Sequence, residues 1–267
     1  MEIVLLTALG VGGATIIGAI IGFIFKKISH KFSDIVLSFA AGVMLSAAVF
    51  GLILPSATEY GGKFGILIAT GGVFAGAICL NLIDKLVPHL HKLAGINPNT
   101  NVIANQEVDC FECEQHKNNA RLNKILLFVL AIAIHNLPEG IAAGVGFGSG
   151  NTSEALVIAG GIALQNVPEG MVIIAPMLAV GLTKKRTFLY ASFTGVVEII
   201  GTLIGYFAVS IASAILPYAL AFAGGTMLYV ISDEMIPETH SHGSQRGATY
   251  ALLFGFCLML AVNILLG

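Results

Sequence analysis

Long apolar segments separated by short polar connections run through the whole chain. Eight of them have about 20 residues or more, enough for a helix to cross the roughly 30 Å hydrocarbon core of a bilayer. The pattern therefore predicts an all-α polytopic membrane protein, a single transmembrane domain over residues 1–267 embedded in a lipid bilayer. The eight segments are residues 3–25, 34–54, 64–87, 122–146, 153–180, 187–210, 212–235 and 247–266.

The composition supports this class of protein. Hydrophobic residues make up 56% of the chain and charged residues only 10%, and the mean hydropathy is +0.90. Glycine accounts for 32 of the 267 residues, an enrichment typical of closely packed membrane helices. The net charge of -2, without a basic stripe, indicates no nucleic-acid partner. The one long polar connection, residues 88–121, is expected to be a loop.

The positions of the 13 lysine and arginine residues predict the orientation in the membrane, because cytoplasmic loops are rich in these residues. When the segments alternate in direction, all of them except Lys63 fall on one side. That side is predicted to be cytoplasmic, so the long loop faces the cytoplasm and both termini face outward. The 12 residues on this side are Lys26, Lys27, Lys31, Lys85, Lys92, Lys117, Arg121, Lys124, Lys184, Lys185, Arg186 and Arg246.

One hexapeptide pattern occurs twice inside the apolar segments. Residues 135–140 read His-Asn-Leu-Pro-Glu-Gly, and residues 165–170 read Gln-Asn-Val-Pro-Glu-Gly. Because residues three or four apart share a helix face, each copy gathers its polar side chains on one side. The proline in each copy has no N–H and frees a backbone carbonyl at the same depth. An imidazole with carboxylates and amides suits Zn²⁺, Fe²⁺, Mn²⁺ or a similar divalent ion.

A third carboxylate, Glu198, lies in the apolar segment 187–210. Left unpaired within the membrane, Glu139, Glu169 and Glu198 would each cost on the order of a few kcal/mol. A bound divalent cation would supply the missing positive charge. The alternative is that each glutamate is protonated and hydrogen-bonded by a neighbouring helix.

Two further stretches resemble each other at a constant offset of 183 residues. Residues 39–45 and 222–228 agree at five of seven positions, and Pro55 and Pro237 follow them. The predicted orientation makes these two segments antiparallel, as it does the two hexapeptide segments. Related segments of opposite direction indicate inverted repeats, which build transporters around a site in the middle of the membrane. Chance similarity between glycine-rich helices is the alternative.

The two hexapeptides, in the fourth and fifth of eight segments, make the chain similar to the ZIP (Zrt/Irt-like protein) family of divalent metal transporters, in particular its short-loop bacterial members. The resemblance covers essentially the whole chain. It implies that Zn²⁺, or another divalent ion such as iron, manganese, cobalt or cadmium, is carried as substrate into the cytoplasm across the bacterial inner membrane. The ligands that it implies, at the middle of the membrane, are His135, Asn136, Glu139, Gln165, Asn166, Glu169 and Glu198.

The resemblance also implies an alternating-access, elevator-like movement of the first, fourth, fifth and sixth segments against the other four. We interpret the glycines of the first segment, Gly18 and Gly22 among them, as allowing it to slide past its neighbours. Some related members have His in place of Gln165 or Asp in place of Asn166, so the two amides weaken a second ion position. A homodimer is a candidate assembly.

Other metal-type side chains lie at the cytoplasmic ends of the third and seventh segments and resemble the family's exit route. Solvated interfacial residues are the alternative. Met44 offers a thioether from the second segment, with core packing as the alternative. In the long loop, Cys110 and Cys113 form a CxxC pair that suits either transient metal capture or no specific role. The residues at the segment ends are Asp84, His89, His91, Glu234, Glu238, His240 and His242.

Three other functions are alternatives to a carrier. A passive divalent metal channel would use the same residues. A membrane metalloenzyme is disfavoured, since di-iron bundles use Glu-x-x-His on pairs of helices, whereas this chain has His-x-x-x-Glu at residues 135–139. No Ser/His/Asp or Cys/His set indicates another enzyme chemistry, so we expect no enzymatic activity. A structural scaffold would leave the buried carboxylates without a reason.

Overall fold

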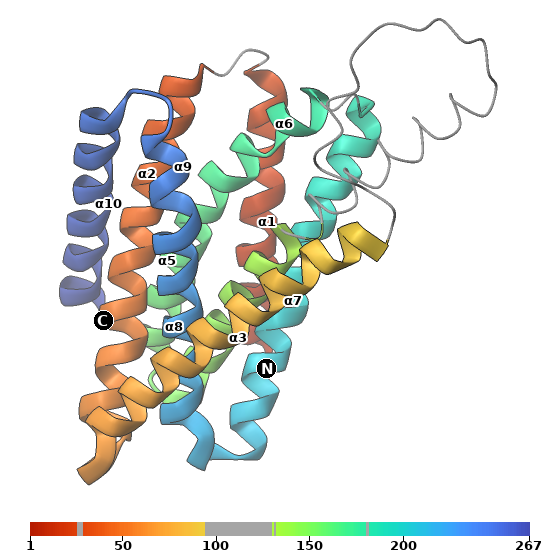
Figure 1. Ribbon diagram of the computed structural model, residues 1–267. Coiled ribbons are helices and arrows are strands. Elements are labelled where there is room, and N and C mark those ends of the chain that lie inside the picture. Colours follow the sequence, from red (N-terminus) through yellow and green to blue (C-terminus); the bar gives the residue numbers. More distant parts are fainter. Residues whose placement is uncertain (26–28, 94–129, 131, 180–181) are drawn as a thin grey trace, which may run out of the picture.

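The apolar segments form helices that pack side by side (Figure 1). The computed structural model describes residues 1–25, 29–93, 130, 132–179 and 182–267, without the side chains of residues 84, 86–93 and 179. One helix covers residues 132–146. The others are α1 (Glu2–Ile24), α2 (His30–Ser46), α3 (Gly65–Leu93), α5 (Thr152–Val172), α6 (Ile174–Ala179), α7 (Lys184–Ile211), α8 (Leu216–Val230), α9 (Ile236–His240) and α10 (Gln245–Leu266).

Within the described residues, seven helical stretches are long and apolar enough to cross a membrane. They correspond to seven of the eight predicted segments, so the prediction of a polytopic helical membrane protein is confirmed. The remaining predicted segment, 122–146, is described only at residue 130 and over 132–146, and the count of eight stays a prediction. The predicted metal-capture pair Cys110 and Cys113 lies outside the described residues, as do the side chains of Asp84, His89 and His91.

Two of the long stretches change their helical geometry before a proline. α2 continues into a π-helical segment, Ala47–Ile53, which precedes Pro55. α8 continues into a π-helical segment, Ile231–Met235, which precedes Pro237 in the first turn of α9. A π-helical turn contains an extra residue and so changes which side chains face a neighbouring helix. The same departure from α-helical geometry thus occurs at equivalent places in the two segments that resemble each other in sequence.

Some packing contacts between helices also repeat at the offset of 183 residues. A Cβ atom on Gly18 would lie 2.2 Å from the carbonyl oxygen of Val167, and one on Gly201 would lie 2.7 Å from that of Leu137. Val167 and Leu137 hold the same place in the two hexapeptides. The first hexapeptide therefore packs on α7 as the second packs on α1. In Figure 1, α1 and α7 run in opposite directions, and so do α2 and α8.

Glycine contacts divide the helices into two groups. In the first group, consisting of α1, α5, α7 and the 132–146 helix, a Cβ atom on Gly12 would lie 2.2 Å from the carbonyl oxygen of Gly195. In the second group, α2, α3, α8 and α10, a Cβ atom on Gly42 would lie 2.0 Å from the carbonyl oxygen of Leu252. No side chain fits into such gaps, so backbones touch directly within each group.

Contacts between the two groups are made differently. A Cβ atom on Gly51, which follows α2, would meet the side chain of Ile158 in α5, and one on Gly161 would meet the side chain of Met259 in α10. These are side-chain contacts and not backbone contacts. The glycines of α1 that make close contacts, Gly18 among them, hold this helix against members of its own group. The interpretation that they let α1 slide past its neighbours stays a prediction.

Candidate metal centre

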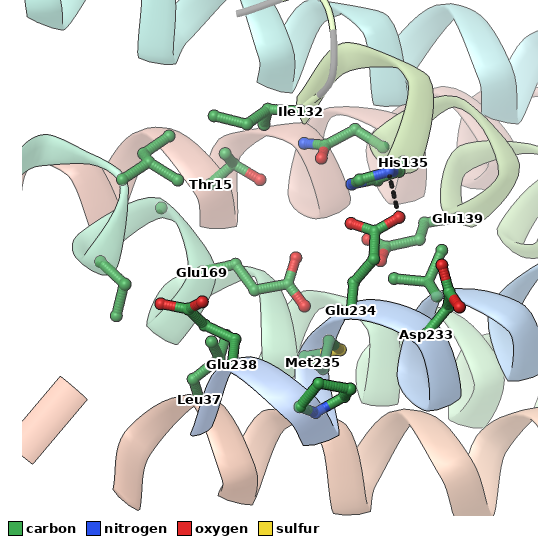
Figure 2. A pocket seen from close by; sticks show the side chains of 16 residues that line it. Thr15, Leu37, Ile132, His135, Glu139, Glu169, Asp233, Glu234, Met235 and Glu238 are labelled. Carbon is green, nitrogen blue, oxygen red and sulfur yellow. Dashed lines mark ion pairs between the residues drawn. The ribbon is translucent and has the colours of Figure 1, made fainter. Parts of the chain in front are cut away.

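The two hexapeptides bring their polar side chains into the interior of the first helix group. Glu139 is 1% exposed and Gln165 0%. A cavity of about 580 Å³ borders these helices, and Figure 2 shows side chains from both hexapeptides around it. The predicted site residues that line the cavity are His135, Asn136, Glu139, Glu169, Glu234 and Glu238, and Thr15, Asp233 and Pro237 line it with them.

Glu198 is completely buried and lies at the centre of a hydrogen-bonded cluster. Thr15 of α1 donates its hydroxyl to Oε1 of Glu198 at 2.6 Å. Asn166 donates its amide to Oε2 at 2.6 Å, and Asn136 donates to Oε1 through a short hydrogen bond. Three donors from three helices therefore stabilise this carboxylate.

Other buried polar atoms near the hexapeptides have no hydrogen-bond partner. They are Oε2 of Glu139, Oε1 of Glu169, Oδ1 of Asn166 and both terminal atoms of the Gln165 side chain. Buried polar atoms in folded proteins are normally satisfied, and an unsatisfied one costs about 1–3 kcal/mol. Oxygen atoms of this kind are suitable ligands for a divalent cation. The chemistry of the donor set therefore fits a bound metal ion.

His135 has a partner in the second helix group. Its Nε2 atom lies 2.8 Å from Oε1 of Glu234, which belongs to the π-helical segment before α9. Figure 2 shows this pair on one side of the cavity, with Glu169 approaching from another helix. In the described part of the chain, no three His, Cys, Asp or Glu side chains are arranged to hold a metal ion. Coordination by His135 through Nε2 would require that this atom leave Glu234.

The remaining predicted residues lie away from this cavity. Met44 is completely buried and belongs to the apolar core, which corresponds to the packing alternative for this residue. His240 has its Nδ1 atom 2.9 Å from the carbonyl oxygen of Ile236, and its Nε2 atom is 3.2 Å from the Thr249 hydroxyl.

His242 stacks on His30 with ring centroids 4.8 Å apart, and its Nδ1 atom lies 3.1 Å from Oδ1 of Asp34. These three residues border a second cavity of about 350 Å³. Glu238 lines both this cavity and the larger one, as do Leu37 and Val172. The two cavities are therefore neighbours.

Thr15 was not among the predicted site residues, although it donates a hydrogen bond to the most buried carboxylate. A single threonine in an apolar helix does not by itself indicate a functional site. However, Thr15 precedes Glu198 by 183 residues, the same offset that relates residues 39–45 to residues 222–228. Extending that comparison to α1 and α7 would have placed Thr15 at the position equivalent to Glu198.

The fold and the site together define a class of protein, a multi-pass membrane protein with buried metal-type ligands between its helices. The chain belongs to the ZIP family, since the family model described as "ZIP Zinc transporter" matches residues 2–263. The resemblance stated from the two hexapeptides is thereby confirmed. Members of this family are transporters, so the protein is a membrane transporter and not an enzyme.

Similar proteins extend over nearly the whole chain. Zinc transporter GufA of Myxococcus xanthus is 36% identical over 268 residues, which cover 98% of this chain and 98% of the relative. Zinc transporter ZIPB of Bordetella bronchiseptica is 36% identical over 259 residues, covering 95% of this chain and 78% of the relative. Zinc transporter ZupT of Chlorobaculum parvum is 34% identical over 267 residues, covering 96% and 94%.

Proposed function

We propose that this transporter carries divalent transition-metal ions, zinc foremost, into the cytoplasm by way of a site between the two hexapeptide helices. The observation that carries the proposal is the set of buried oxygen atoms without partners on Glu139, Glu169 and Asn166. A cation bound there would satisfy them and offset their negative charge. The relatives named above are all zinc transporters, which makes zinc the first candidate for the cargo.

His135 is the proposed nitrogen ligand, and Glu139, Gln165 and Glu169 provide oxygen ligands from the two helices. An imidazole combined with carboxylates is a common ligand set for Zn²⁺ in proteins. The imidazole is placed for this role because it lines the same cavity as Glu139 and Glu169. Its present partner, Glu234, lines that cavity as well, so His135 can exchange the carboxylate for an incoming ion by a side-chain movement.

The cavity supports a direction of access. It extends to α9, where Pro237 and Glu238 line it, and this end of the bundle carries the basic connections that are predicted to be cytoplasmic. In the opposite direction the site borders the apolar core, where Met44, Ala142 and Ile162 are completely buried. The arrangement is that of a carrier open to the cytoplasm and closed to the outside.

The two helix groups, each held together by close backbone contacts at glycines, support an alternating-access mechanism. The hexapeptide helices belong to one group, together with α1 and α7, whose backbones touch theirs. Packing within this group prevents its helices from moving separately, whereas the side-chain contacts with the second group can be exchanged. Movement of the first group as a unit would expose the site to each side in turn, as inverted-repeat transporters do. The protein is proposed to lie in the bacterial inner membrane, with both termini on the outer side.

Glu234, Glu238 and the pair Asp34–His242 are proposed to form the exit route. The larger cavity leads past Glu234 to Glu238, and Glu238 also borders the smaller cavity that contains Asp34 and His242. Carboxylates along such a path provide weak successive sites for an ion that leaves the buried ligands.

A passive channel is the second candidate, and transport kinetics separate the two. The experiment is uptake of radioactive zinc by liposomes that contain the purified full-length protein. A carrier predicts uptake that saturates with zinc concentration, since each cycle needs a conformational change. Linear uptake without saturation would favour the channel. No uptake above that of empty liposomes would refute the proposed function.

A further inference from the structure

We infer that Glu198 is a positioning residue that orients the two asparagine amides, and that the site holds a single ion per chain. This inference rests on the proposed function and departs from the ligand set that the family resemblance implies, which includes Glu198. It concerns the number of ions and the role of each polar residue.

The carboxylate of Glu198 accepts three hydrogen bonds. Oε1 accepts hydrogen bonds from Thr15 and Asn136, and Oε2 accepts one from Asn166. Three of the roughly four acceptor positions of the carboxylate therefore face donors, and Glu198 is 0% exposed. It is also not among the residues that line the 580 Å³ cavity, in contrast to Glu139 and Glu169. A cation would have to displace Thr15 or Asn136 to bind Oε1, and at Oε2 it would lie beside the amide hydrogens of Asn166.

Two acceptors fix the orientation of the Asn166 side chain. Its Nδ2 atom lies 2.6 Å from Oε2 of Glu198 and 3.3 Å from the carbonyl oxygen of Val11. A carboxylate and a carbonyl are both acceptors, so only the nitrogen end of the amide can occupy this place. The other end, Oδ1, is buried and has no partner. Glu198 and Val11 thus fix the amide with its oxygen free for an ion.

The same reasoning applies to Asn136. Its Nδ2 atom donates to Glu198, which directs its oxygen away from that carboxylate. Asn136 also lines the cavity, so this side chain lies between Glu198 and the space that an ion would enter. The hydrogen atoms of two amides and one hydroxyl surround Glu198, and such a positive environment disfavours a second cation beside it.

The hydrogen bond from position 166 to Glu198 depends on the residue type, and aspartate could not form it as asparagine does. A carboxylate at 166 has no hydrogen to donate to Glu198, and two neighbouring carboxylates repel each other unless a proton or a cation lies between them. With asparagine at position 166, a hydrogen bond from its amide to Glu198 takes the place of that proton or cation. Asn166 therefore determines the number of ions, and N166D is expected to create a second ion position.

The test is the stoichiometry of zinc bound to the purified full-length protein in detergent, measured by isothermal titration calorimetry together with metal analysis. We expect one ion per chain in the wild type and two in N166D. E198Q should still bind one ion, with affinity lowered about 10–100-fold, as is typical when a residue that orients a metal ligand is changed. E139A should lose measurable binding, because it removes a ligand. Zinc K-edge X-ray absorption should show the same ligand set for the wild type and E198Q.

Two zinc ions in the wild type would overturn the inference, and so would a single ion in N166D. A changed set of zinc ligands in E198Q would overturn the positioning role of Glu198. The wild-type stoichiometry decides the question even if E198Q does not fold. The proposed function fails separately: in that case the wild type neither binds zinc nor takes it up, whereas two bound ions with normal uptake refute the single-ion site alone.

Discussion

The Nε2 atom of His135 lies 2.8 Å from the Oε1 atom of Glu234, and this pair connects the first hexapeptide to the π-helical segment Ile231–Met235. The two residues belong to different helix groups. A metal ion that uses Nε2 of His135 must displace Glu234, so ion and carboxylate compete for one nitrogen. In the proposed mechanism, Glu234 would thus favour release of the ion from His135 into the cavity.

Removing the charge of Glu234 should strengthen zinc binding. A hydrogen bond to a charged group contributes about 1 kcal/mol more than a neutral one, which corresponds to about fivefold in affinity. Glu234→Gln is therefore expected to lower the zinc dissociation constant about fivefold in titration calorimetry. Asp233→Asn is the matched control, since Asp233 lines the same cavity but does not pair with His135. Unchanged or weaker binding by Glu234→Gln would show that the pair does not compete with the ion.

Close backbone contacts should make α1 sensitive to single methyl groups at some glycines and insensitive at others. A Cβ atom on Gly18 would lie 2.2 Å from the Val167 carbonyl oxygen, whereas one on Gly13 would have no atom within 4 Å. Overpacking of this kind costs about 1–3 kcal/mol. Gly18→Ala should lower the melting temperature in detergent, and Gly13→Ala should not. Equal melting temperatures would mean that α1 and α5 are free to separate.

Locking the two helix groups together should stop transport. Gly51 and Ile158 lie in different groups, and a Cβ atom on Gly51 would be 2.9 Å from Cγ1 of Ile158. In a variant without its four native cysteines, a crosslink between cysteines at these two positions should abolish zinc uptake, and reduction should restore it. The control is a crosslink between positions 39 and 254, whose phenylalanine rings are in contact within the second group.

The control crosslink is expected to leave uptake unchanged, because α2 and α10 move together in the proposed mechanism. Normal uptake by the protein crosslinked between positions 51 and 158 would contradict movement of one group against the other. Loss of uptake in both crosslinked proteins would contradict the assignment of α2 and α10 to one rigid unit.

The fold class and the hexapeptide helices were predictable because their signals are local. Apolar runs of membrane length define the helices, and the paired polar patterns at residues 135–140 and 165–170 stand out within them. Thr15 was predictable in principle. Residues 12–22 and 195–205 are identical at six of 11 positions, and this alignment places Thr15 opposite Glu198. However, threonine and glutamate differ in chemistry, so the alignment alone does not indicate that Thr15 belongs to the site.

The pairing of His135 with Glu234 could not be predicted from the sequence. It depends on how the first helix group packs against the second, and no local pattern in the sequence specifies that packing. The roles of Asn136 and Asn166 were likewise open, since an amide can present either its oxygen or its nitrogen to a neighbour. The acceptors around their nitrogen atoms determine which end faces Glu198.

Uptake of radioactive zinc by liposomes containing the wild type, Glu139→Ala or Glu169→Ala tests the central claim most directly. Glu2→Ala, which changes an exposed carboxylate in the first turn of α1, is the control. The wild type and Glu2→Ala should take up zinc with saturation, and each hexapeptide variant should fall to the level of empty liposomes. Wild-type uptake by both Glu139→Ala and Glu169→Ala would contradict a metal site between the two hexapeptide helices.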